Sequence, residues 1–211
     1  MDLYFSPLAC SMATRIALYE AGADARFIEV DPKTKRTPDA SDYRAINPLG
    51  LVPAIRTDDG EVMTENAAVL QYVADRLPAA ELVPPAGMDR FRLQQWLCFI
   101  GTELHKGLFM PLLDRNAPDG VRTYLLAKGE SRLAYLDRHL AGRDYLLDRF
   151  SVADAYLFTV LNWSSATAVD LARWPAVKDY YTRMRQRASI AKALAEERTL
   201  YVAQQERHKA A

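Results

Sequence analysis

Residues 3–20 read LYFSPLACSMATRIALYE, and this stretch joins a short apolar run to a helical pattern. Pro7 lacks a backbone N–H and cannot continue a paired strand, so residues 3–5 are predicted to form a strand that ends before it. Residues 12–20 have apolar side chains at helical spacing and are predicted to form a helix. The loop between these two elements therefore places Cys10 at the start of a helix.

The same mixture of short elements continues through the first third of the chain. Apolar runs at residues 27–30 and 52–55 predict two more strands, and residues 67–77 have helical spacing until Pro78 interrupts it. Eight of the eleven prolines lie in the first 85 residues. This part of the chain is therefore predicted to be a small α/β domain.

A change in composition follows this domain. Residues 78–87 read PAAELVPPAG and contain two adjacent prolines without periodicity, which is typical of a linker. Helical patterns then continue almost to the end of the chain. We expect an α/β domain at residues 1–78, a linker at residues 79–87 and an all-α domain at residues 88–211.

Charge and composition disfavour several classes of function. Lysine and arginine together number 27, as do aspartate and glutamate, which disfavours a dedicated nucleic-acid binder. We find no pattern of a secretion signal and no apolar stretch of the roughly 18 residues that a membrane helix needs. The two cysteines, Cys10 and Cys98, lie far apart without a metal-binding spacing. We expect a cytoplasmic protein without a bound metal that contacts neither nucleic acid nor membrane.

Cys10 is the first candidate for chemistry. Unpaired N–H groups and the helix dipole at a helix start favour a thiolate, either of the protein or of a bound small thiol. A small buried hydrophobic residue is the alternative interpretation of a single cysteine. A dithiol oxidoreductase would need a second cysteine three positions away, where the chain has Pro7 and Ala13. Any redox chemistry here would therefore use one thiol.

The second candidate lies in the turn-rich stretch LGLVPAIRTDDG at residues 49–60. Pro53, near the start of the predicted strand, can adopt a cis bond. Such a bond would direct the amide and carbonyl of Val52 outward, where an extended peptide can pair with them. An ordinary trans proline in a turn is the alternative.

Thr64, Glu65 and Asn66 form the third candidate, between a predicted strand and a helix. Thr64 or Asn66 can cap the helix, which is a purely structural role. The helix start also offers N–H groups to a carboxylate, while Glu65 offers an anion to an ammonium group. These residues would together suit the headgroup of an α-amino acid.

Five motifs in register give the chain a resemblance to a known family. They read SPLACS, NPLGLVPA, TENAAVLQYVAD, WLCFIGTELHKG and FSVADAYLFTVL. In this order and spacing, the chain from residue 1 to about residue 198 resembles the bacterial beta-class glutathione S-transferases. The resemblance implies a thioredoxin-like α/β domain and an all-helical domain. It also implies a homodimer, with glutathione bound in a cleft between the domains.

The resemblance implies roles for residues of the first domain. Cys10 would lie beside the sulfur of glutathione, with Ser11 as a nearby donor. Val52 would pair with the cysteinyl unit through its main chain. Glu65 and Asn66 would hold the γ-glutamyl end, although serine is common in the family at the position of Asn66.

Further residues carry over from the family in the same way. Lys35 would bind the glycyl carboxylate of glutathione, and a solvated residue in a basic run is its alternative. His105 and Lys106 would reach the region of the sulfur, whereas a satisfied histidine between domains is the alternative for His105. Thr102 and Glu103 would contribute to the site across the dimer.

A helix is predicted around residues 93–108 from its spacing of apolar residues, without the family resemblance. Its apolar positions form one stripe, which predicts a core face: Leu93, Leu97, Ile100, Leu104 and Leu108. Cys98, Thr102 and His105 are predicted to project together from a second face. Family members often carry asparagine in place of Cys98. With three histidines in the chain and no carboxylates clustered near His105, no metal site is predicted.

Ser151 and Asp154 have the spacing of a capping box before an apolar run. Ser151 is expected to accept from the amide of Asp154, while Asp154 accepts from the amide of Ser151. This pair is therefore predicted to be structural and not catalytic.

The predicted activity is transfer of the glutathione sulfur to small hydrophobic electrophiles, with Cys10, His105 and Lys106 as catalytic residues. A free thiol has a pKa near 8.5, so little of it is ionised at neutral pH. We expect the helix dipole, donors at Ser11 and His105 to lower the pKa of the bound sulfur. Tyr4, at the end of the first strand, is an alternative activating residue.

Two other functions are compatible with the same residues. A glutathione-dependent thiol reductase would pass through a mixed disulfide at Cys10 and would reduce small glutathione disulfides. A non-catalytic protein of this fold would bind glutathione or apolar ligands without chemistry. Reduction assays and calorimetry of glutathione binding discriminate between these functions.

Overall fold

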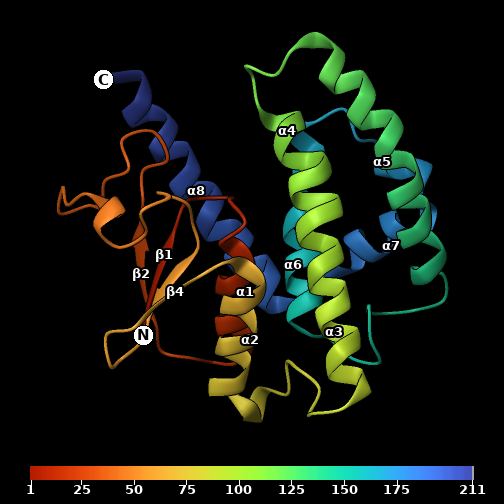
Figure 1. The fold of residues 1–211 in the computed structure, drawn as a ribbon, viewed down its shortest axis with the longest axis horizontal. Coiled ribbons are helices and arrows are strands. Elements are labelled where there is room, and N and C mark those ends of the chain that lie inside the picture. Colours follow the sequence, from red (N-terminus) through yellow and green to blue (C-terminus); the bar gives the residue numbers. More distant parts are fainter. Residues whose placement is uncertain (211) are drawn as a thin grey trace. The chain divides into compact units, whose positions relative to one another are not determined.

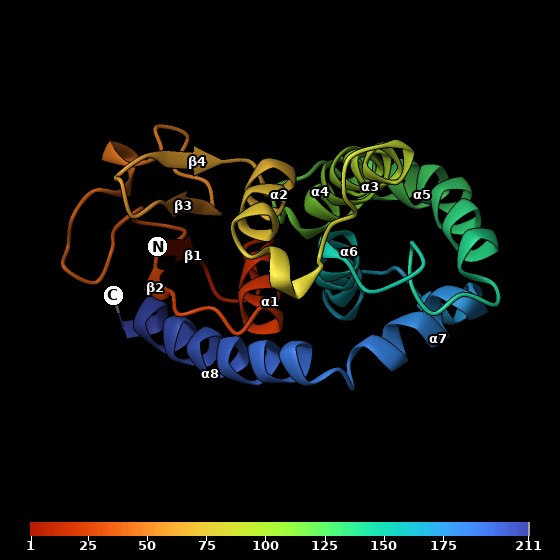
Figure 2. The same ribbon diagram turned by 90° about the horizontal axis from the view of Figure 1, so that it is seen from below.

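The computed structural model describes residues 1–210, apart from the side chain of Asp119 (Figures 1 and 2). It contains two compact units, the sheet unit (residues 1–82 and 188–210) and the helical unit (residues 83–187). The boundary at Leu82 falls inside the predicted linker. The last helix belongs to the sheet unit, whereas we expected it in the all-α domain, because it packs against the first helix.

Four strands form the sheet, in the order β2-β1-β3-β4. They are β1 (Asp2–Phe5), β2 (Arg26–Glu29), β3 (Ala54–Arg56) and β4 (Val62–Thr64). β1 pairs parallel with β2 and antiparallel with β3, which pairs antiparallel with β4. With α1 (Met12–Glu20) between β1 and β2 and α2 (Asn66–Arg76) after β4, this is the predicted thioredoxin-like domain.

The central strand β1 is buried on both faces, since Leu3, Tyr4 and Phe5 each expose at most 3% of their surface. Tyr4 lies in a cluster with Tyr43, whose ring centroid is 5.5 Å away. Tyr43 belongs to the short 3-10 helix η1 (Tyr43–Ala45). The ring of Tyr4 is therefore part of the core.

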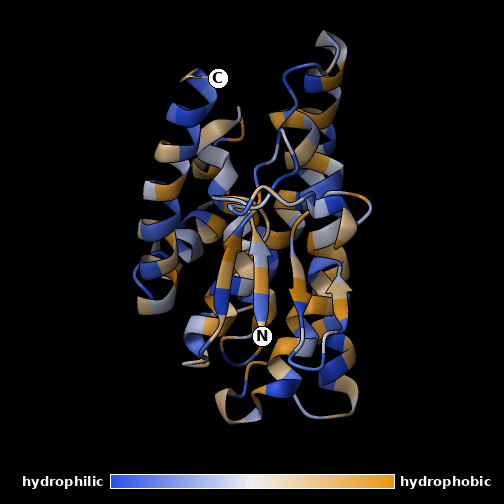
Figure 3. Ribbon diagram, turned by 90° about the vertical axis from the view of Figure 1, so that its left-hand side faces the viewer, coloured by the Kyte–Doolittle hydropathy of each residue, from blue (hydrophilic) through white to orange (hydrophobic). Residues whose placement is uncertain are grey.

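Helices α1 and α8 (Ala188–Ala210) pack against each other in the sheet unit (Figure 2). Every residue of α1 from Met12 to Leu18 is buried, so this helix has neighbours on all sides. In Figure 3, the strands contain hydrophobic residues, whereas hydrophilic residues recur along α8. The 3-10 helix η2 (Pro78–Ala80) follows α2, within the predicted linker region.

The helical unit is built around α6 (Val152–Leu161), all ten residues of which are buried. Its other helices are α3 (Met88–Phe99), α4 (Met110–Leu113), α5 (Asp119–Leu140) and α7 (Pro175–Met184). A π-helical segment, η3 (Ile100–Phe109), joins α3 to α4. Two 3-10 helices, η4 (Asn162–Ala166) and η5 (Leu171–Arg173), follow α6.

Asp154 confirms the predicted capping box at the start of α6. Its carboxylate accepts from the Ser151 N–H at 2.9 Å, and also from the Leu146 N–H and the Tyr180 hydroxyl. Asp154 is fully buried, so this carboxylate organises the unit from within. Among residues 1–210, no helix is both long and apolar enough to cross a membrane.

Candidate functional site

The loop between β1 and α1 brings Cys10 to the start of the helix, as predicted. The side chain of Cys10 is half-buried, and its Sγ lies 3.1 Å from the carbonyl oxygen of Val52, to which the thiol can donate. The peptide bond between Val52 and Pro53 is cis. Two segments that the sequence singled out separately, 42 residues apart, therefore meet at one thiol.

The start of α2 is attached to the same loop. Asn66 is buried, and its Nδ2 donates to the carbonyl oxygen of Cys10 at 3.0 Å. Its Oδ1 is also buried and has no hydrogen-bond partner among residues 1–210. Asn66 thus connects two of the predicted site segments directly.

The alternative interpretation, in which Thr64 or Asn66 caps α2, is wrong. Thr64 is the last residue of β4, and Asn66 is already the first residue of the helix. The cap is Glu65, which has a left-handed φ of 67° and makes no capping bond with its side chain. The exposed Glu65 carboxylate is therefore available at the helix start.

Ser11 has a different environment from Cys10. Its side chain is fully buried, and its Oγ accepts from the Ser6 N–H at 3.2 Å and donates to the Ser6 carbonyl at 3.3 Å. The hydroxyl that we expected to act as a donor to a ligand is thus turned inward and holds the loop. The Ser11 hydroxyl is therefore not available to a ligand.

Lys35 lies in the connection between β2 and η1, and its side chain runs along Gly50. A Cβ placed at Gly50 would lie 3.2 Å from the Lys35 Cδ, a tight contact, so glycine eases this approach. Gly50 also has a left-handed φ of 61°. Within residues 1–210, the Lys35 ammonium has no ion-pair partner, which leaves its charge available to an anion.

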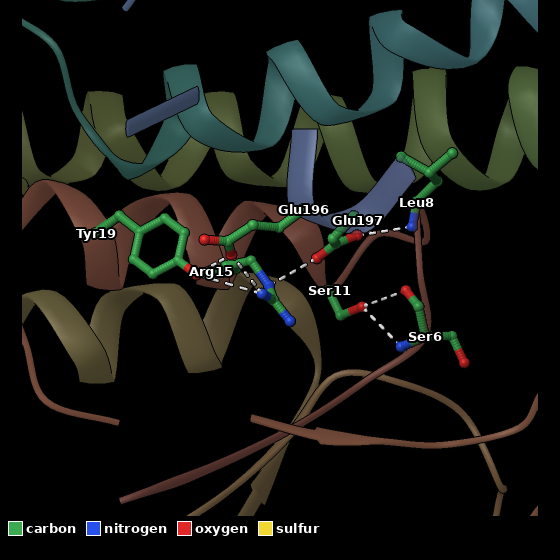
Figure 4. A network of polar contacts seen from close by, with 7 residues as sticks. All are labelled: Ser6, Leu8, Ser11, Arg15, Tyr19, Glu196 and Glu197. Carbon is green, nitrogen blue, oxygen red and sulfur yellow. Dashed lines mark hydrogen bonds and ion pairs between the residues drawn. The ribbon is translucent and has the colours of Figure 1, made fainter. Parts of the chain in front are cut away.

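A buried charged network holds the Cys10 loop from α8 (Figure 4). The Leu8 N–H donates to Glu197 Oε2 at 2.6 Å, and Leu8 has a left-handed φ of 59°. The Glu197 side chain is fully buried, and its Oε1 lies 3.0 Å from the Nε of Arg15 on α1. Arg15 also pairs with Glu196, which is 40% exposed. A helix at one end of the chain thus fixes a loop at the other.

Burial determines the electrostatics of this network. The Arg15 guanidinium lies over the rings of Phe5 and Phe27, 4.2 Å from each centroid. Burial raises the pKa of Glu197 to about 7, although the charge of Arg15 and the Leu8 N–H act in the opposite direction. A buried cation and a buried carboxylate each need the other as a partner.

Glu197 was not predicted from the sequence. The available signal was Arg15, a charged residue on a helix that is otherwise mostly apolar, since buried arginines almost always have an acidic partner. Nothing in the sequence around residue 197 identifies that partner.

The helical unit contains the other predicted site residues. His105, on η3, is buried, and its Nδ1 lies 2.7 Å from the hydroxyl of Tyr156 on α6. Its ring packs edge-on against Trp163, with centroids 5.0 Å apart. Burial, with a smaller contribution from the charge of Lys106, lowers the pKa of His105 to about 4. The imidazole is therefore neutral at pH 7 and can assist a sulfur anion by hydrogen bonding but not by charge.

The predicted second face with Cys98, Thr102 and His105 is wrong. Cys98 and Thr102 are exposed, whereas His105 is buried. The prediction assumed 100° per residue, but the wider turns of η3 change the angle between these side chains. The apolar stripe is confirmed, because all five of its members expose at most 1% of their surface.

The remaining predicted residues of η3 have neighbours within the helical unit. The Glu103 carboxylate accepts from the Arg132 Nε of α5 at 2.8 Å. Thr102 donates to the carbonyl of Cys98 at 2.9 Å, and the exposed Lys106 ammonium lies 3.3 Å from the Met110 sulfur. Among residues 1–210, no three histidine, cysteine, aspartate or glutamate side chains cluster in a way that would hold a metal ion.

In chemical terms, the sheet unit presents a thiol at a helix start, next to the main chain of Val52 before a cis-proline. A helix N-terminus favours a thiolate, whether of Cys10 or of a ligand. An exposed carboxylate at Glu65 and a cation at Lys35 suit a ligand that carries both an ammonium group and a carboxylate. The arrangement fits a small peptide thiol.

Comparisons with known proteins agree with this geometry. The family description "Glutathione S-transferase, N-terminal domain" matches residues 9–76, and "Glutathione S-transferase, C-terminal domain" matches residues 112–183. Glutathione S-transferase GstA of Escherichia coli O157:H7 is 39% identical over 199 residues, which are 93% of this chain and 98% of the relative.

Solved structures are similar over the same extent. A sphingomonad glutathione S-transferase complexed with glutathione is 42% identical, with a TM-score of 0.89, over 93% of this chain and 98% of that one. The bacterial beta-class enzyme of Sphingomonas chungbukensis is 39% identical, with a TM-score of 0.88 and the same coverage of both chains. The similarity thus extends through both units.

Proposed function

Because this chain belongs to the glutathione S-transferase family, we propose that it transfers the sulfur of glutathione to small hydrophobic electrophiles. One observation carries the proposal. The thiol of Cys10 stands at the start of α1, 3.1 Å from the carbonyl oxygen of Val52, so a peptide paired with Val52 would have its own thiol nearby. The helix start favours the anionic form of that sulfur.

We propose that glutathione is held by four residues of the sheet unit. The main chain of Val52 pairs with the cysteinyl unit, and Lys35 binds the glycyl carboxylate. Glu65 and Asn66 hold the γ-glutamyl end: the Glu65 carboxylate pairs with its α-ammonium group, and the Asn66 Oδ1 accepts a hydrogen bond from the same group. The unpaired Asn66 Oδ1 and the exposed Glu65 carboxylate support this assignment.

The sulfur is activated by lowering its pKa from the ordinary value near 8.5. The N–H groups of Met12 and Ala13 already donate to the turn before α1, so the positive end of the helix dipole stabilises the thiolate. Cys10 contributes a hydrogen bond or acts as a thiolate itself. The buried Ser11 hydroxyl supports the loop, so Ser11 contributes by holding Cys10 at the start of the helix.

Residues of the helical unit have roles that carry over from the family resemblance. His105 and Lys106 act on the reacting groups, His105 as a neutral hydrogen-bonding imidazole and Lys106 as a cation. Thr102 and Glu103 contribute to glutathione binding in a homodimer. A cytoplasmic location belongs to the same proposal.

The proposal is tested by the pH profile of conjugation to an aryl halide, in the wild type, Cys10→Ala and His105→Ala. We expect Cys10→Ala to lower the rate about tenfold and to move the profile to higher pH, because its sulfur is less stabilised. His105→Ala should lower the rate without moving the profile, since the imidazole is neutral. Wild-type rates and profiles in both variants would disprove the activation, and absence of glutathione binding in calorimetry would disprove the function.

A further inference from the structure

Segment η3 (Ile100–Phe109) is π-helical over ten residues. At its end, the Met110 N–H donates to the carbonyl of His105, five residues earlier, whereas an α-helix uses the carbonyl four residues earlier. π-Helical turns usually occur singly and frequently at functional sites. The long π segment here contains all four of the predicted site residues of the helical unit.

Gly107 permits this hydrogen-bond register. A Cβ built on Gly107 would lie 2.6 Å from the carbonyl oxygen of Thr102, closer than real side chains come to backbone. Thr102 is five residues earlier, so this carbonyl is the one that the π register brings near. Alanine at position 107 could not keep the register unless the backbone shifted.

Gly101 belongs to the same segment but has room for a side chain. A Cβ built there would meet the hydroxyl of Tyr156 at 3.6 Å, an ordinary van der Waals contact. The two glycines of η3 therefore differ in one respect: only Gly107 would bring a methyl group into the backbone of the helix. Together they form a matched pair for mutation.

The register determines the direction of His105. With α-helical spacing, His105 would share a face with Cys98 and Thr102, both of which are exposed. In η3 it is instead buried, with its Nδ1 2.7 Å from the Tyr156 hydroxyl. Because Tyr156 engages Nδ1, Nε2 is the ring atom that remains for a reactant.

We propose that Gly107 is a positioning residue for the conjugation reaction, which maintains the π register that turns His105 toward Tyr156. The proposal rests on the proposed function, because it assumes that His105 acts on the reactants. Gly107 itself touches neither reactant and acts through the backbone. Its replacement should thus change the setting of His105 and the rate together.

The experiment compares Gly107→Ala with Gly101→Ala. For each, kcat with an aryl halide is measured, and the His105 imidazole is titrated by NMR. We expect Gly107→Ala to lower kcat about tenfold, since a small misplacement of a reacting group has a large effect on rate. The pKa of His105 should move from about 4 toward its ordinary 6.5 as the ring leaves its buried site. Gly101→Ala should match the wild type in both measurements.

Each other outcome is decisive. Wild-type kcat in Gly107→Ala overturns the positioning role, whatever happens to the titration, and so does an equal loss in both glycine variants. If the wild type forms no conjugate, the proposed function fails. In that case the titration alone tests Gly107, and an unchanged pKa of His105 in Gly107→Ala would show that Gly107 does not position the ring.

A second variant covers the case in which Gly107→Ala does not fold. Tyr156→Phe removes the hydroxyl that holds Nδ1 of His105 and leaves the backbone of η3 unchanged. The proposal expects a loss of kcat of the same order, about tenfold. Wild-type kcat in Tyr156→Phe would overturn it, because the direction of His105 would then have no effect on the rate.

Discussion

The sheet unit and the helical unit hold their proposed reactive side chains by different means. The Cys10 loop depends on a buried ion pair, in which the side chain of Glu197 is fully buried. His105 depends on a neutral hydrogen bond and aromatic contacts, while the ion pair of its neighbour Glu103 is 30–39% exposed. In the sheet unit a buried carboxylate is therefore paired with a cation, whereas in the helical unit the buried carboxylate of Asp154 is held by neutral donors. Four measurements test this difference between the units.

The largest effect is expected when the buried pair loses its cation. Arg15→Met would leave the Glu197 carboxylate buried without its counter-ion, so the free energy of unfolding at pH 8 should fall by about 3–5 kcal/mol. The loss should shrink below pH 7, where Glu197 takes up a proton. Urea denaturation at both pH values measures it.

Arg132→Met is the matched control in the helical unit, where the pair with Glu103 is partly exposed. It should lower the free energy of unfolding by less than about 1 kcal/mol. Equal losses in the two variants would contradict the comparison.

The next effect concerns pH. The pKa of Glu197 is raised from 4.5 to about 7, so the folded protein binds this proton more tightly than the unfolded chain. Its contribution to stability is complete below pH 4.5 and is lost as the pH rises through about 7. We therefore compare the free energy of unfolding of Glu197→Gln with that of the wild type at each pH. The difference should move in favour of the variant as the pH rises from 5 to 8, by on the order of 2 kcal/mol.

Glu196→Gln makes the same chemical change on the neighbouring, partly exposed partner of Arg15. Its stability should follow the pH dependence of the wild type in the same denaturation series. A Glu197→Gln curve that also runs parallel to the wild type would show that this carboxyl group does not titrate in the range.

A smaller effect is expected at the start of α6. Ser151→Ala removes one side of the capping box, and the free energy of unfolding should fall by about 1 kcal/mol. Ser131→Ala, on an exposed helix surface, should leave it unchanged. A neutral result at Ser151 would mean that Asp154 and its other donors hold this helix start alone.

The smallest effect is expected at His105, whose charge should not change near neutral pH. His105 has a pKa of about 4, so NMR should detect no change in its charge between pH 5.5 and pH 8. The ratio of conjugation rates between the wild type and His105→Gln should be constant over the same range. A slope in that ratio would show that the ring is more accessible than its burial indicates.

Local signals in the sequence predicted the elements of the sheet unit. The strand before Pro7, the helix at residues 12–20 and the capping box follow from the chemistry of a few neighbouring residues. The segments of Cys10 and Val52 were each identified from neighbouring residues alone, but their contact was not predicted from those residues.

Other features depend on contacts that sequence patterns do not record. Glu197 lies far from Arg15 in the sequence, and no periodicity around it predicts that it is buried. The π register of η3 was missed because helical analysis assumes one angle per residue, and the direction of His105 followed that error. The cap of α2 is Glu65, whose left-handed φ separates β4 from the helix, and no local pattern indicates such a φ at a glutamate.

The packing of α8 against α1 has a consequence for synthesis on the ribosome. Arg15 leaves the exit tunnel early, while the residue that neutralises it is translated near the end, after the whole helical unit. The sheet unit therefore cannot complete its interior during elongation, and the helical unit, whose residues are contiguous, is the first that can finish. A truncated product ending at residue 82 would lack the acid that its buried guanidinium requires.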